Sequence, residues 1–118
     1  IGRRSGHPQP QTSLELVEEV LTCSLDAFCQ QRGVIPNHLK IDVDGVESDI
    51  IRGASSLLAN PTLRSILIEL DLSSETDREC KQTIEAFGFS VLHVQRKPLV
   101  GVYAQSELAN VTFIRNQF

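Results

Sequence analysis

Three carboxylates lie close together where a predicted strand gives way to a predicted helix. Asp42, Asp44 and Glu47 end or follow the alternating apolar residues of a strand over residues 38–43. Gly45 allows the backbone to turn tightly at this point. In open α/β sheets, ligands bind outside the carboxyl ends of the strands. A carboxylate there can orient a substrate hydroxyl or accept its proton, so this junction is the candidate site of chemistry.

The same residues also have structural interpretations. Asp44 and Glu47 have the spacing of a capping box, and a helix cap contributes about 1 kcal/mol. Capping alone explains these two residue types, whereas for Asp42 we favour the chemical role. Lys40 lies between apolar neighbours in the strand. It could pair with a carboxylate of the site as a catalytic residue, or extend from a sheet edge into solvent.

A second pair of carboxylates, Glu69 and Asp71, ends the nearly continuous apolar run of residues 65–71. In a parallel sheet they would lie beside Asp42, and such oxygen ligands suit Mg²⁺ or Ca²⁺. Carboxylates at strand ends are common, however, and the spacing is weak evidence for a metal. We therefore place Glu69 among the substrate-side or capping residues and assign no metal site.

The rest of the chain alternates strand-like and helix-like stretches. Further strands are predicted over residues 65–71, 89–95 and 110–115, and the helices between them end at Asn60–Pro61 and at Gly88. The second of these helices is capped by Ser73 or Ser74. This alternation predicts an α/β fold with mostly parallel strands and helices on both faces. The last strand follows no evident helix and is predicted to be antiparallel.

Residues 14–31 have two interpretations. Their apolar residues fit one amphipathic helix, but residues 17–23 also suit a short strand. In the second case a helix follows, capped by Ser24 and ended by Gly33. We favour the strand followed by the helix, because Ser24 is a natural N-cap.

The composition describes one small domain. The 118 residues suffice for a single core over residues 14–118, after a flexible lead-in over residues 1–13 that is rich in glycine, proline and polar residues. The net charge of −4 and the absence of a basic stripe argue against a nucleic-acid partner. No apolar run is long enough to cross a membrane. The three cysteines match no zinc or redox motif and are expected to be reduced and mostly buried, as in a cytoplasmic protein.

Residues 40–54 resemble a motif of the FkbM-type methyltransferases. The motif in their fourth strand reads K-I-D-V-E-G-x-E, followed by a hydrophobic helix and a Gly-Ala pair, and here Asp44 replaces the second acidic residue. Residues 22–28 resemble the family element T-x-(S)-L-D-D, with Ala27 in place of its last Asp, and residues 66–71 resemble strand five. The resemblance implies a class I, Rossmann-like fold that uses S-adenosylmethionine to methylate hydroxyl groups of small molecules or sugars.

The sequence departs from the family at the cofactor pocket. The glycine-rich turn after the first strand of the family is not found, so the resemblance is to the C-terminal half of the enzyme. We expect the chain to supply the substrate-side half of the site, and we do not expect this chain alone to bind the cofactor tightly. The alternative is a non-catalytic α/β module. The strand over residues 38–43 would then be an open edge, which predicts a homo-oligomer or pairing with a missing N-terminal half.

Overall fold

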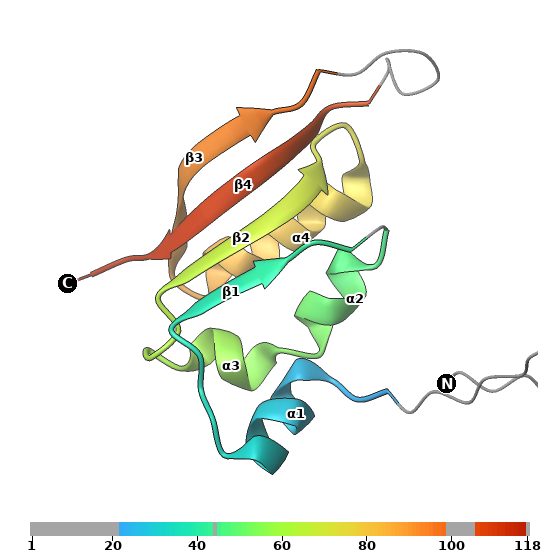
Figure 1. Cartoon of the computed structure of the whole chain (residues 1–118). Helices are drawn as coiled ribbons and strands as arrows, with labels where there is room; N and C mark the ends of the chain where they lie inside the picture. The colour runs from blue at the N-terminus through green and yellow to red at the C-terminus, as the bar shows by residue number, and fades with distance from the viewer. Residues whose placement is uncertain (1–21, 44, 99–105, 118) are drawn as a thin grey trace, which may run out of the picture.

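The computed structural model describes residues 22–43, 45–98 and 106–117 (Figure 1). In chain order its elements are α1 (Leu25–Arg32), β1 (His38–Ile41), α2 (Glu47–Arg52), α3 (Ser55–Ala59), β2 (Ser65–Asp71), α4 (Glu75–Ala86), β3 (Phe89–Arg96) and β4 (Leu108–Arg115). The predicted lead-in over residues 1–13, most of the predicted strand over residues 17–23, and Asp44 lie outside the described residues.

Helix α1 has the ends that its sequence predicts. The side chain of Ser24 accepts a hydrogen bond from the backbone N–H of Ala27 at 3.1 Å, and Gly33 ends the helix with a φ of 66°. Ser24 therefore satisfies one of the free N–H groups of the first turn, and Gly33 adopts the left-handed conformation that a residue with a Cβ atom disfavours. The predicted cap at each end is confirmed.

The sheet has the strand order β1-β2-β4-β3 (Figure 1). β1 pairs with β2 in parallel, whereas β4 pairs antiparallel with both β2 and β3. The prediction of an antiparallel last strand is confirmed, but the prediction of mostly parallel pairing is wrong. β3 runs in the same direction as β2, yet the two are not neighbours because β4 lies between them.

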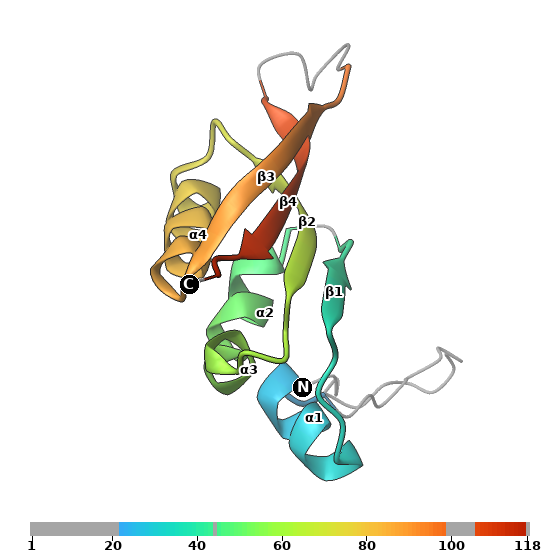
Figure 2. The ribbon, with the colours of Figure 1, turned by 90° about the vertical axis from the view of Figure 1, so that its left-hand side faces the viewer.

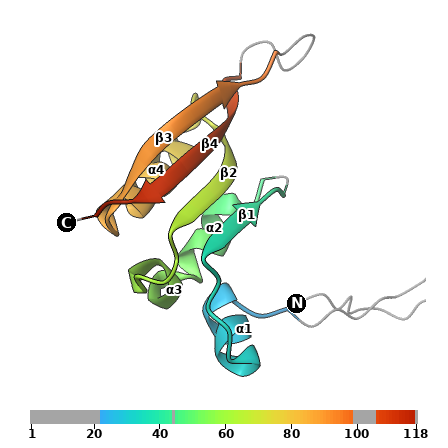
Figure 3. The ribbon, with the colours of Figure 1, turned by 60° about the vertical axis from the view of Figure 1, so that its left-hand side comes forward.

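One face of the sheet forms the core. Alternate residues of β2 and β4 are completely buried, namely Ile66, Ile68 and Leu70 in one strand and Ala109, Val111 and Phe113 in the other. Helices α2, α3 and α4 lie on one side of the sheet in the described part of the chain (Figures 2 and 3). The predicted cover of helices on both faces is therefore wrong for the described residues. The opposite face carries side chains of intermediate exposure, such as Leu67 and Thr112.

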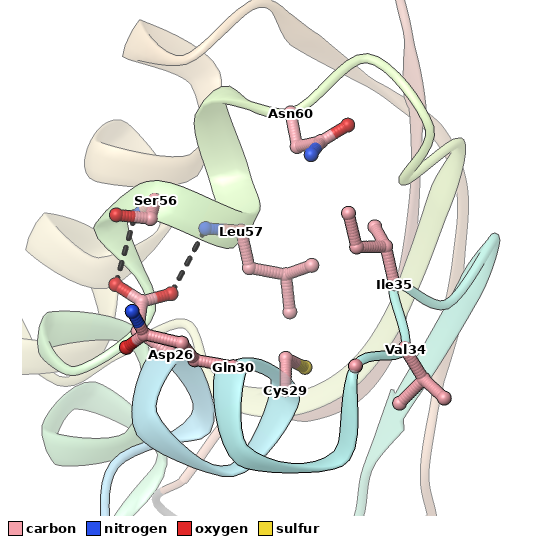
Figure 4. Close-up of a pocket in the computed structure, with 9 residues that line it drawn as sticks. Asp26, Cys29, Gln30, Val34, Ile35, Ser56, Leu57 and Asn60 are labelled. Atoms are coloured by element: carbon pink, nitrogen blue, oxygen red, sulfur yellow. Dashed lines mark hydrogen bonds between the residues drawn. The ribbon is translucent and has the colours of Figure 1, made fainter.

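The segment between β1 and β2 forms two short helices, where one was predicted. The break falls at Gly53, whose carbonyl accepts a hydrogen bond from the backbone N–H of Asp26 at 3.0 Å. A Cβ atom at Gly53 would lie only 2.9 Å from the Cβ of Ser24. The Asp26 carboxylate caps α3 by accepting hydrogen bonds from the N–H groups of Ser56 and Leu57 at 2.8 and 2.9 Å (Figure 4). Contacts from α1 thus fix where α2 ends and α3 begins.

Two further expectations concern cysteines and the membrane. All three cysteines are free, but only Cys80 is buried, since Cys23 is exposed and Cys29 is intermediate. In the described part of the chain, no helix combines the length and the apolar character that a membrane span requires.

Candidate functional site

An open groove of about 850 Å³ lies at the carboxyl ends of β1 and β2. Its charged residues come from four places in the fold, and they are Glu47, Glu69, Asp71, Asp77 and Lys97. The hydroxyl groups of Ser74 and Thr76 also line it. Because four carboxylates face one ammonium group, the groove is acidic and rich in hydrogen-bond acceptors.

Glu47 is the one charged residue in the described part that is buried, with only 5% of its surface exposed. Helix α2 begins at Glu47 and its N-cap is Val46, so the predicted capping box that starts at Asp44 is wrong. The Glu47 carboxylate accepts hydrogen bonds from its own backbone N–H and from that of Gly45. Burial raises the pKa of Glu47, the negative charges of Asp77 and Glu69 add to this effect, and the backbone hydrogen bonds oppose it.

Asp71 and Asp77 join the end of β2 to the start of α4. The backbone N–H of Asp71 donates to Asp77 Oδ2 at 2.7 Å, and the Asp77 N–H donates to Ser74 Oγ at 3.3 Å. Asp71 Oδ1 accepts hydrogen bonds from the Ser73 hydroxyl at 2.6 Å and from the N–H groups of Ser73 and Glu107, both at 3.0 Å. These bonds to the charged form lower the pKa of Asp71, with the Ser73 side chain contributing most.

Lys97 forms an ion pair with Glu69 on the wall of the groove. The Glu69 side chain is only 15% exposed, so the pair is better protected from water than a typical surface pair. The backbone N–H of Lys97 donates to the carbonyl of Leu108 at 3.0 Å, which anchors the start of the β3–β4 connection. The charge of Glu69 is thus balanced within the protein.

Sequence reasoning missed Lys97 and Asp77. Asp77 lies in the helix whose predicted cap is Ser73 or Ser74, and Ser74 and Asp77 have the three-residue spacing of a capping box. That spacing was a usable signal. Lys97 follows a strand without any motif, and only the pairing of β3 with β4 brings it to Glu69.

Lys40 and Asp42 lie beside this groove. Both side chains are exposed, and they line a separate groove of about 480 Å³ at the β1 edge of the sheet. Val43 lines both grooves, so the two are adjacent. In the register of the sheet Lys40 lies opposite Leu67, on the face that the described helices leave uncovered. The structure thus brings Glu47 and Glu69 together and sets Lys40 and Asp42 one groove away, while Asp44 lies outside the described residues.

A hollow of about 460 Å³ between α1 and α3 is less suited to chemistry (Figure 4). The carboxylate there belongs to Asp26, and both of its oxygens are used to cap α3. The other polar side chains on its wall, including Gln30 and Asn60, carry no charge. Across the described residues, no three His, Cys, Asp or Glu side chains are grouped so that they could hold a metal ion.

The mixed α/β architecture and the groove at the strand ends are compatible with a methyltransferase-like fold. The sequence matches the methyltransferase FkbM domain over residues 3–91, which is well over half of the chain. The chain therefore belongs to the FkbM methyltransferase family. The matched range includes α1 to α4, β1, β2 and the start of β3. The comparisons with curated proteins and with solved structures gave no match.

Proposed function

We propose that this chain is the C-terminal portion of an S-adenosylmethionine-dependent O-methyltransferase of the FkbM type. It supplies the substrate-side half of the site, and the acceptor is a hydroxyl group of a small molecule or a sugar. The observation that carries the proposal is the acidic groove at the carboxyl ends of β1 and β2 in a member of this family. Ligands of open α/β sheets bind at this end, and carboxylates accept hydrogen bonds from hydroxyl groups.

The residues present suit the acceptor better than the whole cofactor. S-adenosylmethionine would supply the methyl group, and the carboxylates suit the positive charge of its sulfonium. Among the described residues, however, the turn between β1 and α2 holds the single glycine Gly45 and no glycine-rich segment. We therefore assign the acceptor side to this part of the chain. The groups that seat the nucleoside are assigned to a part of the fold outside the described residues.

Within this proposal, Asp42 orients the acceptor hydroxyl and Lys40 supports it. The two residues are two positions apart at the end of β1, a spacing that places them on the same side of an extended chain. A carboxylate accepts hydrogen bonds from hydroxyl groups, and the ammonium group of Lys40 is a hydrogen-bond donor on the same side of the chain. The exposure of Asp42 leaves its oxygens accessible from the adjacent groove.

The test is methyl transfer by the intact enzyme in which this chain supplies the acceptor side. Alanine in place of Asp42 is expected to lower kcat by more than about tenfold with the fold unchanged, because positioning a reactant is worth at least that much. Asp49→Ala is the matched control, since Asp49 is exposed on α2 and pairs with Arg52 at the surface. An equal rate for the Asp42 variant and the control would refute the assignment.

One observation favours an alternative, a non-catalytic module that self-associates. In the described sheet β1 is an edge strand that pairs with β2 alone, and edge strands can pair with another chain. This proposal predicts a dimer or a larger assembly. Light scattering measures the molar mass in solution, and the mass of a monomer would refute the proposal. Calorimetric titration with S-adenosylmethionine separates the two proposals, because micromolar binding indicates a complete cofactor site. For either function we propose a cytoplasmic location, given the free cysteines.

A further inference from the structure

We infer that Glu47 is the general base that accepts the proton of the acceptor hydroxyl. This inference rests on the proposed function and deepens it, since Asp42, which lines the adjacent groove, then has only to hold another part of the acceptor molecule. Glu47 lines the acidic groove and is only 5% exposed, and it is the buried charged residue of the described core. A carboxylate at the wall of a groove, shielded from water, can take a proton directly from a bound hydroxyl group.

Two of the other carboxylates of the groove are already engaged by strong partners. Glu69 is paired with the Lys97 ammonium group, and Asp71 Oδ1 receives three hydrogen bonds. Asp77 Oδ2 accepts a hydrogen bond from the N–H of Asp71, and Asp77 is only half-buried, unlike Glu47. Glu47 accepts from two backbone N–H groups, whereas a carboxylate has about four acceptor positions. Glu47 therefore has acceptor capacity left for a substrate, and no cation among the described residues forms a salt bridge with it.

The charges around Glu47 favour the uptake of a proton. Asp77 faces it from α4 and Glu69 from β2, and both are acidic. Cys80 of α4 also lies within electrostatic reach, and burial raises the pKa of its thiol to about 11, so that the thiol is neutral at pH 7. Two nearby cations pair with other carboxylates, since Lys97 pairs with Glu69 and Arg52 with Asp49. Burial, which contributes most, and the two carboxylates raise the pKa of Glu47, and this direction favours the uptake of a proton.

The step is balanced without a further reactant. S-adenosylmethionine, when bound, would supply the methyl group, and the methyl carbon would bond to the acceptor oxygen as its bond to the sulfonium sulfur breaks. The sulfur would keep the electron pair of the broken bond and leave as a neutral thioether. The hydroxyl proton passes to the Glu47 carboxylate, and solvent at the open side of the groove later removes it.

The first experiment is an NMR titration of the Glu47 side-chain carboxyl in the full chain. The carboxyl is expected to titrate above the ordinary value of 4.5, and Asp77→Asn is expected to bring the midpoint down because it removes a neighbouring negative charge. A midpoint at or below 4.5 overturns the inference. This measurement needs neither cofactor nor turnover, so its outcome is independent of the proposed function.

The second experiment measures methyl transfer by the intact enzyme against pH. Glu47→Gln is expected to lower kcat by roughly 10²-fold or more, the usual effect of losing a general base, and to abolish the acid limb of the pH profile. Glu47→Asp is expected to restore part of the rate with a shifted acid limb. Glu79→Gln is the control, since Glu79 is exposed on α4.

Two results of this assay would count against the inference, and they are distinguishable. If wild-type enzyme and Glu47→Gln share the same rate and pH profile, the role of Glu47 is refuted while the proposed function stands. If the wild-type enzyme transfers no methyl group to any hydroxyl acceptor, the proposed function fails and the role of Glu47 fails with it. Circular dichroism of each variant confirms that it is folded.

Discussion

The side chain of Arg115 ties together the ends of several elements, and its removal is expected to weaken the fold strongly. Its guanidinium group donates to the carbonyls of Leu63, Leu58 and Asn60, each at 2.7 Å, and to that of Phe87 at 3.3 Å. The guanidinium carbon also lies 4.3 Å from the centre of the Phe89 ring. Three of these carbonyls lie at the ends of α3 and α4, where no further turn of helix can supply a donor.

The size of the effect follows from these contacts. A hydrogen bond to a charged group contributes about 1.5–3 kcal/mol, and losing a donor leaves the buried acceptor unsatisfied. The four bonds share one side chain and are not additive, so we expect Arg115→Met to cost roughly 3–5 kcal/mol of unfolding free energy. For a domain of this size that is a fall in Tm of roughly 12–20 °C. Arg115→Lys keeps the charge but loses the planar fork of donors, and it should cost about half as much.

The assay is urea unfolding followed by circular dichroism. Arg96→Met is the matched control, because Arg96 lies on the neighbouring strand in an ion pair with Glu107 whose side chains are 63% and 56% exposed. Pairs of that kind contribute only about 0–1 kcal/mol. A loss at Arg115→Met no larger than the loss at Arg96→Met would show that the carbonyls find other donors, and the reasoning would be wrong.

Three further predictions concern packing and ionisation. Gly53→Ala is expected to lower the free energy of unfolding in urea by about 1–3 kcal/mol, because the new Cβ atom would lie 2.9 Å from the Cβ of Ser24. Adding Ser24→Gly should recover most of this loss, since glycine is itself an acceptable N-cap. A double variant no more stable than Gly53→Ala would exclude the clash. The pKa of Asp71 is lowered in the folded chain, so its contribution is fully present above the ordinary value of 3.8 and is lost as the pH falls through the lower folded value. Asp71→Asn should therefore lose most stability at neutral pH, and the gap to wild type should close in acid; a gap independent of pH would contradict the assignment. Burial raises the pKa of Cys80 to about 11, so iodoacetamide at pH 8 should modify the exposed Cys23 and spare Cys80 in the native protein. Mass spectrometry of the labelled protein measures this difference. Equal labelling of the two cysteines would mean that the core opens readily.

Local signals predicted the parts of the fold that depend on neighbouring residues. Ser24 and Gly33 mark the ends of α1 because an N-cap and a left-handed C-cap need only the adjacent turn. The apolar run over residues 65–71 gives β2 with the same bounds, since a strand between two others buries one face against a core. The mixed α/β class followed from the alternation of such elements.

The remaining features depend on contacts between distant residues, and no local pattern encodes them. Helix α2 stops at Gly53 because Ser24 of the preceding segment lies against it, which no reading of residues 46–58 alone could reveal. The insertion of β4 between β2 and β3 is decided by which strands pair, and the alternating pattern of each strand fits several partners equally well. Parallel pairing was therefore overestimated.

In the candidate site too, some features follow from local sequence signals and others depend on contacts between distant residues. The types of Glu47 and Glu69 and their positions near strand ends indicated the edge of the sheet where the acidic groove lies. The types and positions of these residues do not indicate which carboxylate is buried. The burial of Glu47 and its electrostatic environment arise only when α4 brings Asp77 beside the end of β1. A sequence motif thus locates the acidic edge of the sheet, while the packing of a later helix decides which of its carboxylates is shielded from water. Asp42 is the prominent acidic residue of the motif, yet the structure leaves it in water and isolates Glu47.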